Sequence, residues 1–192
     1  GLATVWTTLP STWTLAAPPV SPAAAFSSVT LTSFTVSWNP NSNPGYTSYY
    51  VEISTISGVG TSSAAAGWNI FTSTAFTGLA TGSTYYARVK ARNQNLAETY
   101  LVSLGSTRTV LAVPVPASPA ITSVGTISVA GAWSDPRNPA GTTYEAWISS
   151  NGYTNYFSSA TNLTNTTFTG LSTNTIYALR VSYRHHKHKR RK

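Results

Sequence analysis

Apolar and polar residues alternate along several short stretches of this chain. In residues 33–38 each hydroxyl residue is followed by an apolar or aromatic one, and residues 49–53 alternate again after a Pro-Gly turn. Residues 85–92 show the same alternation, with their basic side chains on one face. A period of two residues is the pattern of a strand with one buried and one solvated face. The three stretches therefore predict β-strands, and the basic face of residues 85–92 is expected to point to solvent.

Helices are not expected in this sequence. Thr, Ser, Val, Tyr and Gly dominate it, and the 11 prolines recur in clusters every few dozen residues. These residue types favour strands and turns over helices. Short strands separated by turns are typical of an antiparallel sandwich. The expected fold class is all-β.

The sequence repeats itself with an offset of 95 residues, as between Trp38 and Trp133. A chain of 192 residues with this period holds two domains, each long enough to form a core without disulfides or metals. The frame of the repeat is shifted, because the stretch around Leu9 matches the stretch around Leu104. The segment that closes the first domain thus also opens the chain.

Each repeat has a Trp in an early strand, a Leu six residues before a Tyr, and an alternating strand after that Tyr. In these positions the sequence resembles fibronectin type III domains, and the resemblance points to a bacterial or archaeal extracellular or surface repeat protein. It implies two immunoglobulin-like antiparallel β-sandwiches in tandem, with these residues in the cores. The expected core residues are Trp38, Leu79, Tyr85, Val89, Trp133, Leu171, Tyr177 and Val181.

The expected organisation has four parts. Residues 1–22 form a strand and a Pro-rich joint, residues 23–112 the first domain, residues 113–119 a Pro-rich linker and residues 120–192 the second domain. Pro-rich joints favour extended, stiff backbone and act as spacers. The second domain is expected to lack its last strand, because a basic tail, 184–192, follows Tyr183.

The shifted frame predicts how copies of the chain join. A domain without its last strand exposes an unpaired edge, to which another chain can add a strand. We expect the N-terminal segment of one subunit to become the final strand of domain 2 in the next. Such a contact is heterologous and builds a head-to-tail filament, although one longer covalent array of repeats fits the same pattern. The expected donor residues are Val5, Thr7, Leu9, Thr12, Thr14 and Leu15.

The formal net charge of +8 is concentrated at one end of the sequence. Six of the 12 Lys and Arg residues lie in residues 184–192, so the rest of the chain is nearly neutral and rich in hydroxyl groups. This composition suits a secreted adhesive or fibrous module, and nucleic acid is not an expected partner. Two other readings of the tail are binding of a polyanion and binding of a metal by His185, His186 and His188.

Residues for catalysis are few. The four acids, Glu52, Glu98, Asp135 and Glu145, fall in separate elements, and all three histidines lie in the tail, so neither a carboxylate pair nor a Ser-His-Asp triad is expected. Cys is absent, and no apolar run reaches the length of a membrane span. The sequence predicts a non-enzymatic protein without a cofactor, located outside the cell or at its surface.

The 23 aromatic residues exceed what two small cores need. Some are expected to be exposed, either packed across strands or available for stacking on sugars or a neighbouring subunit. An adhesive or glycan-binding module of a larger secreted protein or enzyme is therefore the alternative function. Asn162 and Asn165 fit the N-glycosylation pattern. The candidate exposed aromatics are Tyr46, Tyr50, Tyr86, Trp147, Tyr153, Tyr156 and Phe157.

Overall fold

The computed structural model describes residues 7–58, 62–135 and 137–183. All regular elements among these residues are strands, and all pairings between them are antiparallel. The all-β prediction is confirmed. The chain divides into two compact units, one built on residues 1–79 and 83–109 and the other on residues 80–82 and 110–192. We call them domain 1 and domain 2.

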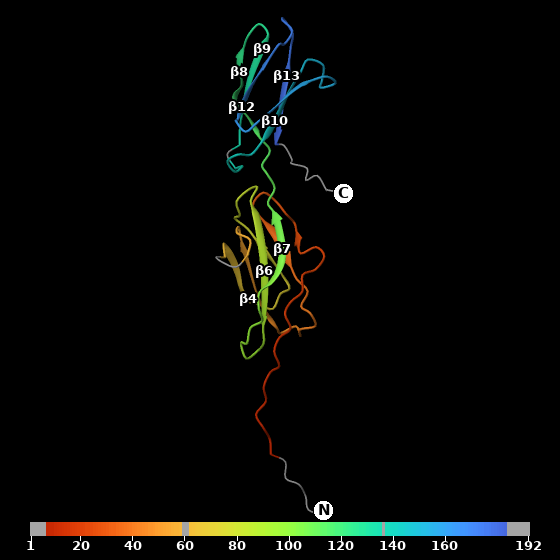
Figure 1. Cartoon of the computed structure of the whole chain (residues 1–192), viewed down its shortest axis with the longest axis vertical. Coiled ribbons are helices and arrows are strands. Elements are labelled where there is room, and N and C mark those ends of the chain that lie inside the picture. Colours follow the sequence, from red (N-terminus) through yellow and green to blue (C-terminus); the bar gives the residue numbers. More distant parts are fainter. Residues whose placement is uncertain (1–6, 59–61, 136, 184–192) are drawn as a thin grey trace, which may run out of the picture. The chain divides into compact units, whose positions relative to one another are not determined.

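Domain 1 is a sandwich of a three-stranded sheet and a four-stranded sheet (Figure 1). The first has the order β1-β2-β5 and the second the order β4-β3-β6-β7. The seven strands are β1 (Phe26–Ser27), β2 (Phe34–Ser37), β3 (Ser48–Ser54), β4 (Ala64–Asn69), β5 (Ser73–Phe76), β6 (Thr84–Arg92) and β7 (Val102–Arg108). The predicted strands 33–38, 49–53 and 85–92 correspond to β2, β3 and β6.

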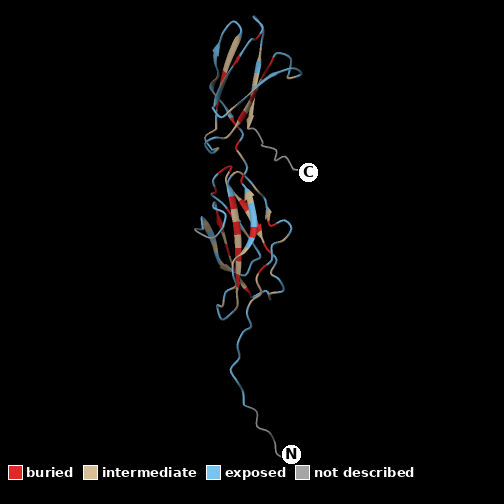
Figure 2. Ribbon diagram, viewed as in Figure 1, coloured by how far each residue is buried: buried red, intermediate tan, exposed pale blue. Residues whose placement is uncertain are grey.

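The core of domain 1 lies between its two sheets, and buried residues alternate with more exposed ones along β3 and β6 (Figure 2). The ring of Phe34 is 1% exposed and packs against the rings of Tyr85 and Phe76, with centroids 5.8 and 6.1 Å away. Trp38 packs on Tyr49 across the sheets, with centroids 5.8 Å apart. Because large aromatic side chains occupy inward-facing positions of these strands, the alternation of apolar and polar residues is easy to recognise in the sequence.

In its described residues, domain 2 has six strands in two three-stranded sheets of order β12-β9-β8 and β11-β10-β13. Its core is smaller and centres on the Trp133–Tyr144 pair, whose ring centroids are 5.8 Å apart. The strands are β8 (Val115–Val124), β9 (Ser128–Ser134), β10 (Tyr144–Ser149), β11 (Phe157–Thr161), β12 (Asn165–Thr169) and β13 (Ala178–Tyr183).

The expected linker at residues 113–119 overlaps the first strand of domain 2. Most of that segment belongs to β8, where Val115 pairs with Ser134 at the edge of its sheet. In domain 1 the equivalent Val20 forms a β-bridge with Asn39. Proline is tolerated on an edge strand because its missing N–H leaves no gap in the hydrogen-bonded ladder. The second Pro-rich segment therefore contains the start of the first strand of domain 2, whereas the first pairs with domain 1 through a single bridge.

Candidate functional site

The candidate site is the edge of domain 2 formed by β13. In domain 1, β6 lies between β3 and β7. The equivalent strand β13 pairs with β10 from Tyr144↔Tyr183 to Ser149↔Ala178, and on its other side no strand follows within the described residues. An exposed edge of this kind presents unpaired backbone groups to any strand that can add to it.

Side-chain burial on the two equivalent strands differs accordingly. In β6, Ala87 and Val89 are fully buried. Their counterparts in β13, Leu179 and Val181, are only half-buried, and the same holds for Tyr177 against Tyr85. The three side chains of domain 2 are thus as large as their counterparts in domain 1 or larger, and they are nevertheless less buried. We refer to Tyr177, Leu179 and Val181 as the open seam.

Two residues of β9 have smaller side chains than their counterparts in β2, which leaves more space beside one end of the open seam. Val129 takes the place of Phe34, and Gly131 takes the place of Val36. The side-chain volume lost at Gly131 is compensated by Leu179. A Cβ at Gly131 would lie 2.0 Å from Leu179 Cδ2, so the Leu179 side chain fills that space. The loss of the Phe34 ring is not compensated in the same way, so the space beside Val129 stays open.

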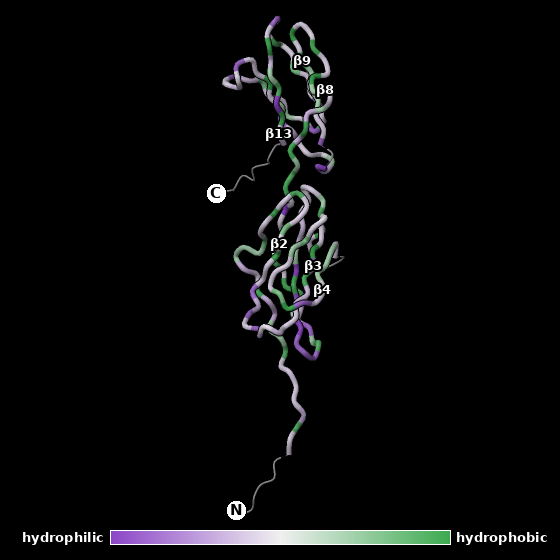
Figure 3. Tube along the Cα trace, turned by 180° about the vertical axis from the view of Figure 1, so that it is seen from behind, coloured by the Kyte–Doolittle hydropathy of each residue, from purple (hydrophilic) through white to green (hydrophobic). Residues whose placement is uncertain are grey.

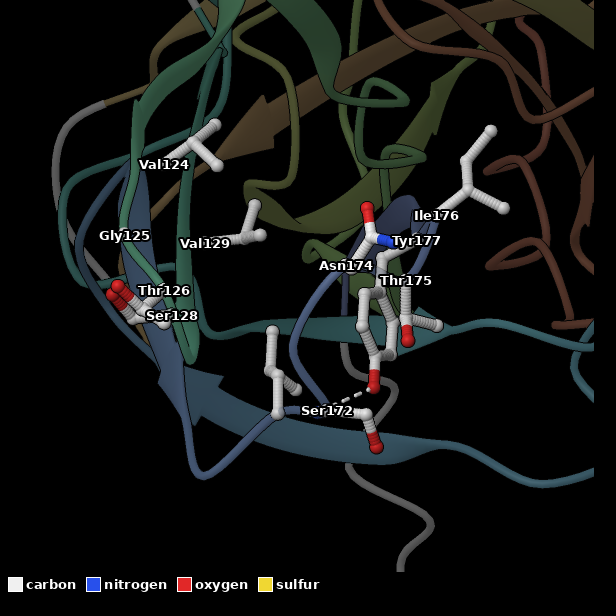
Figure 4. A pocket seen from close by; sticks show the side chains of 11 residues that line it. Val124, Gly125, Thr126, Ser128, Val129, Ser172, Asn174, Thr175, Ile176 and Tyr177 are labelled. Atoms are coloured by element: carbon white, nitrogen blue, oxygen red, sulfur yellow. Dashed lines mark hydrogen bonds between the residues drawn. The ribbon is translucent and has the colours of Figure 1, made fainter.

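A cavity of about 430 Å³ opens beside Val129. Figure 4 shows Val124 and Val129 on one side of it, with Tyr177 and Thr175 facing them. The Tyr177 hydroxyl accepts a hydrogen bond from the Ser172 N–H at 3.0 Å, which ties the strand to the loop before it. This bond is the tyrosine corner typical of immunoglobulin-like sandwiches.

The corner loop has the same backbone shape in both domains. Asn174 has a φ of 49°, and the equivalent Gly82 has a φ of 60°. Asn and Gly are the residues that adopt this left-handed conformation most readily. In domain 1 the loop is held by the end of β7: the Thr109 N–H donates to the Ser83 carbonyl at 3.0 Å, and the Ser83 N–H donates to Thr109 Oγ1 at 3.0 Å.

The N-terminal segment carries the residues expected to act as donor. Residues 7–16 form no strand, and Leu9 and Leu15 are 80% and 77% exposed. Thr7, Thr12 and Thr14 are exposed as well, whereas Val5 lies outside the described residues. Figure 3 shows apolar residues as isolated green stretches along this otherwise weakly polar segment.

The end of this segment is attached to loops of domain 1. The Asn93 side chain donates to the Thr14 carbonyl at 3.0 Å, and the Asn95 side chain donates to Thr12 Oγ1 at 3.1 Å. The Trp13 ring meets the Tyr46 ring edge to face, with centroids 5.5 Å apart. These contacts involve side-chain and carbonyl groups of residues 12–14 and leave Leu9 in solvent.

An asparagine fixes the segment that enters each domain by the same pair of hydrogen bonds. Asn43 accepts from the Ala17 N–H at 2.8 Å and donates to the Ala17 carbonyl at 2.7 Å. Asn138 does the same to Ala112, at 2.7 and 2.9 Å. We call this pair of bonds the asparagine clamp. The sequence analysis missed it, although both residues match at the 95-residue offset.

The buried tyrosine next to the clamp differs between the domains. The Tyr144 hydroxyl accepts from Asn138 at 3.2 Å and donates to the Asp135 carboxylate. The Tyr49 hydroxyl is buried without a hydrogen bond among the described residues, because Pro40 stands where domain 2 has Asp135. Burial raises the pKa of Tyr49, and the nearby Asn43 amide opposes part of that rise.

The outer faces of the equivalent sheets pair their side chains by different chemistry. In domain 1, Arg88 binds Glu52 at 2.5 Å. In domain 2 the equivalent Arg180 lies over the ring of Trp147, 5.3 Å from its centroid, and over Tyr153 at 3.9 Å. The basic residues of β6 and β13 thus cover aromatic or acidic neighbours, and they are not free in solvent as the alternation alone predicted.

The remaining candidate aromatics fall into two groups. Tyr50 packs on Trp68 within the outer face of domain 1, with centroids 5.6 Å apart, and Tyr86 is half-buried. Tyr156 and Phe157 are 52% and 56% exposed and line a second cavity in domain 2, of about 390 Å³. Cross-strand packing therefore accounts for the first group, and the second group remains available to a ligand.

Both candidate glycosylation residues are accessible. Asn162 lies in the turn between β11 and β12, and Asn165 opens β12. Both are exposed. Neither takes part in the open seam or in the cavities described above.

The structure does not gather chemistry for metal binding or membrane insertion in its described part. No group of three or more His, Cys, Asp or Glu lies together there, and His185, His186 and His188 are outside it with the rest of the basic tail. Glu52 is paired with Arg88, and Glu98 with Lys90 at 2.5 Å. Among the described residues, no helix is long and apolar enough to cross a membrane.

Comparison with known proteins bears on the fold. Residues 18–101 match the family model of the Fibronectin type III domain. The two fibronectin type-III domain segment from chicken tenascin is similar with a TM-score of 0.59 and 15% sequence identity, over 87% of this chain and 91% of that one. The FN1-FN3 domains of chicken CNTN1 match with a TM-score of 0.33 and 15% identity, over 85% of this chain and 62% of that one.

A search among curated proteins finds no match to this sequence. At 15% identity the likeness to the tenascin segment shows the fold, and the family model independently places the pattern on residues 18–101. The chain is therefore an all-β protein of two fibronectin type III-like β-sandwiches in tandem, the second of which ends, in the part that the structure describes, on the open strand β13.

Proposed function

We propose that this chain is a non-enzymatic structural unit of an extracellular or cell-surface filament. The N-terminal segment of one copy adds to β13 of another copy and becomes the last strand of its domain 2. The partner is then the protein itself, joined head to tail. A surface rich in Ser, Thr, Asn and Tyr with only 8% charged residues agrees with a location outside the cell.

The observation that carries this proposal is the match between the N-terminal segment and β7. At the 95-residue offset, Thr7, Leu9, Thr12 and Thr14 correspond to Val102, Leu104, Thr107 and Thr109. These four residues of β7 are the more buried ones of that strand and its end, with Leu104 at 4% and Thr109 at 2% exposed. The N-terminal segment therefore has the side chains that a last strand places toward the core.

One residue sets how the added strand pairs. Pro10 stands where β7 has Gly105, whose φ of 88° is not available to proline. The Gly105 N–H bonds to Ser103 Oγ at 3.2 Å, next to a bulge in the ladder with β6. The donor is expected to keep the inward side chains and to form its own version of the bulge.

Chain connectivity supports another copy as the acceptor. In the chain, β7 leads within a few residues to Ala112 and the start of domain 2. The donor likewise leads through Thr14 to Ala17 and the start of domain 1. A donor seated in a domain 2 therefore places that domain before domain 1, whereas the chain's own domain 2 follows it. Donor and acceptor surfaces differ, so the contact repeats and builds a filament.

Electron microscopy and sedimentation of the full chain test the proposal. Filaments are expected for the natural sequence and not for Leu9→Asp, because a carboxylate cannot enter the seam. Leu9 is 80% exposed in the single chain, so the substitution leaves both domains folded. The matched control is Leu163→Asp, at an exposed leucine of the β11–β12 turn. Filaments that persist in Leu9→Asp would contradict strand donation.

The second candidate function is that of an adhesive or glycan-binding module of a larger secreted protein or enzyme. The cavity of about 390 Å³ favours it, because Tyr156 and Phe157 lie beside Asn151 and Asn155. Exposed aromatic faces next to amide groups suit stacking and hydrogen bonding to sugars.

A glycan array distinguishes this candidate from the filament. Binding that vanishes in Tyr156→Ala and persists in Tyr46→Ala would support it, since both tyrosines are 52% exposed but only Tyr156 lines the cavity. The same Tyr156→Ala chain should form filaments as the natural one does. No bound glycan at high protein concentration would exclude this function.

A further inference from the structure

The hydrogen bonds that hold the end of β7 in domain 1 have an unused counterpart in domain 2. The N–H and the hydroxyl of Thr109 donate to the Ser83 carbonyl of the corner loop at 3.0 and 3.3 Å. The Ser83 N–H in turn donates to Thr109 Oγ1 at 3.0 Å. The residue equivalent to Ser83 is Thr175, which lies three residues before the start of β13 and beside the cavity of about 430 Å³. Thr175 is exposed, and its one hydrogen bond in the described structure joins its hydroxyl to the Thr173 carbonyl.

The residue of the donor that matches Thr109 is Thr14. We propose that Thr14 seats the donor strand by binding the backbone of Thr175 in another copy, with the same reciprocal bonds that Thr109 makes to Ser83. This inference rests on the strand donation proposed above and adds the residue that sets its register. Thr14 is exposed in the single chain, so its hydroxyl and N–H are accessible to a partner.

The corner loop of domain 2 is already shaped to accept these bonds. Asn174 holds the left-handed conformation that Gly82 holds in domain 1, with φ values of 49° and 60°. Tyr177 fixes the other side of the loop through its bond to the Ser172 N–H. The backbone on both sides of Thr175 is thus positioned before any partner arrives, and pre-organised groups lose less entropy on binding.

The cavity beside this loop gives the contact a second component. Val124, Val129 and Leu171 supply apolar walls to it, and Thr175 and Tyr177 stand on the facing side. A strand whose Thr14 binds Thr175 lies along the open side of Tyr177 and covers that mouth. Burial of the apolar walls then adds to the reciprocal hydrogen bonds, and together they fix one register out of those that an open edge permits.

The contact that Thr14 makes in its own chain does not compete with this role. Asn93 binds the Thr14 carbonyl, and no side-chain bond of Thr14 is used. The Thr14 hydroxyl is therefore available for the contact with Thr175 of another copy. Replacing it leaves the attachment of the segment to domain 1 as it is.

The test uses the full chain with Thr14→Val, which keeps the branched shape and removes the hydroxyl. We expect the chain concentration needed for half-maximal assembly to rise about threefold to tenfold, the range that one net hydrogen bond gives. Ser11→Ala is the matched control, because its counterpart Ser106 points to solvent in β7. Thermal unfolding of domain 1 should be unchanged in both variants.

Three outcomes distinguish the proposed role of Thr14 in setting the register from strand donation itself. Weakened assembly in Thr14→Val with an unchanged Ser11→Ala supports the contact. Unchanged assembly in Thr14→Val, with assembly abolished in Leu9→Asp, overturns the role of Thr14 and leaves strand donation standing. Assembly unchanged in all three variants overturns both proposals.

Discussion

Domain 1 and domain 2 repeat one sandwich, and they differ most along one pair of equivalent strands. In β6, Ala87 and Val89 are fully buried because β7 and the facing sheet cover them. In β13, Leu179 and Val181 are larger or equal in size and still half-exposed. The last strand therefore contributes more than hydrogen bonds, since it determines whether the neighbouring strand has a dry face.

The largest expected effect tests what β7 contributes to domain 1. Leu104→Ala removes a side chain that is 4% exposed, and we expect it to lower the free energy of unfolding of domain 1 by about 2–5 kcal/mol. Leu9→Ala, at the matching position of the free segment, should change it by less than about 0.5 kcal/mol below the assembly concentration. Denaturant unfolding of the two variants measures both values. Equal losses would contradict the claim that the leucine stabilises domain 1 only where the strand is in place.

A medium effect is expected at the asparagine clamp. Asn43→Ala removes two hydrogen bonds to Ala17, and Asn138→Ala removes two to Ala112 and one to the Tyr144 hydroxyl. We expect losses of about 1–3 kcal/mol, larger for Asn138, because that change also leaves a buried phenol with one partner fewer. Each variant should destabilise its own domain, which calorimetry resolves as separate transitions. A larger loss for Asn43 would contradict the account.

A smaller effect separates the two kinds of side-chain pairing on the outer faces. Arg88→Ala removes an ion pair whose side chains are 14% and 12% exposed, and Arg180→Ala removes stacking on Trp147 and Tyr153. The first pair should weaken as salt is raised, whereas the stacking should respond less, with losses of about 0.5–2 kcal/mol for each. Unfolding at low and high salt measures the difference. The same salt dependence in both would show that the aromatic pairing is not distinct.

The smallest effect is a pH dependence of domain 1 caused by Tyr49. Burial raises its folded-state pKa above the ordinary value of 10.0 for tyrosine. The unfolded state therefore releases the proton first, and the stability of domain 1 is fully present below pH 10 and falls as the pH rises beyond it. Tyr49→Phe should flatten this fall when thermal unfolding is followed from pH 9 to 11. A slope that the substitution leaves unchanged would mean that other groups cause it.

The sequence predicted the parts of the fold that depend on local pattern. Strands β2, β3 and β6 each have one apolar and one polar face, so period-two alternation identifies them. Trp38 and Trp133, which match at the repeat offset, lie in the two cores at 4% and 3% exposure. Tyr177 and Val181 were expected in a core as well, and they are half-buried because no strand among the described residues lies beside β13 as β7 lies beside β6.

Features that depend on contacts between distant segments were not predictable in the same way. The Pro-rich segments were interpreted as spacers because their composition favours extended backbone, and an edge strand such as β8 has extended backbone too. Burial of Pro19 and Pro114 distinguishes the two, and it requires the folded structure. The cavity is a similar case, because Val129 in place of Phe34 is visible in the sequence, but the space that it leaves is not.

Hydrogen exchange along β13 tests most directly whether a second copy completes domain 2. In the full chain at assembling concentration, we expect the amides of Ala178–Tyr183 to be protected to a degree similar to those of Thr84–Arg92 in β6. In Leu9→Asp at the same concentration, those β13 amides that do not bond to β10 should exchange at least about tenfold faster, with β6 unchanged. Identical exchange of β13 in the two chains would contradict strand donation.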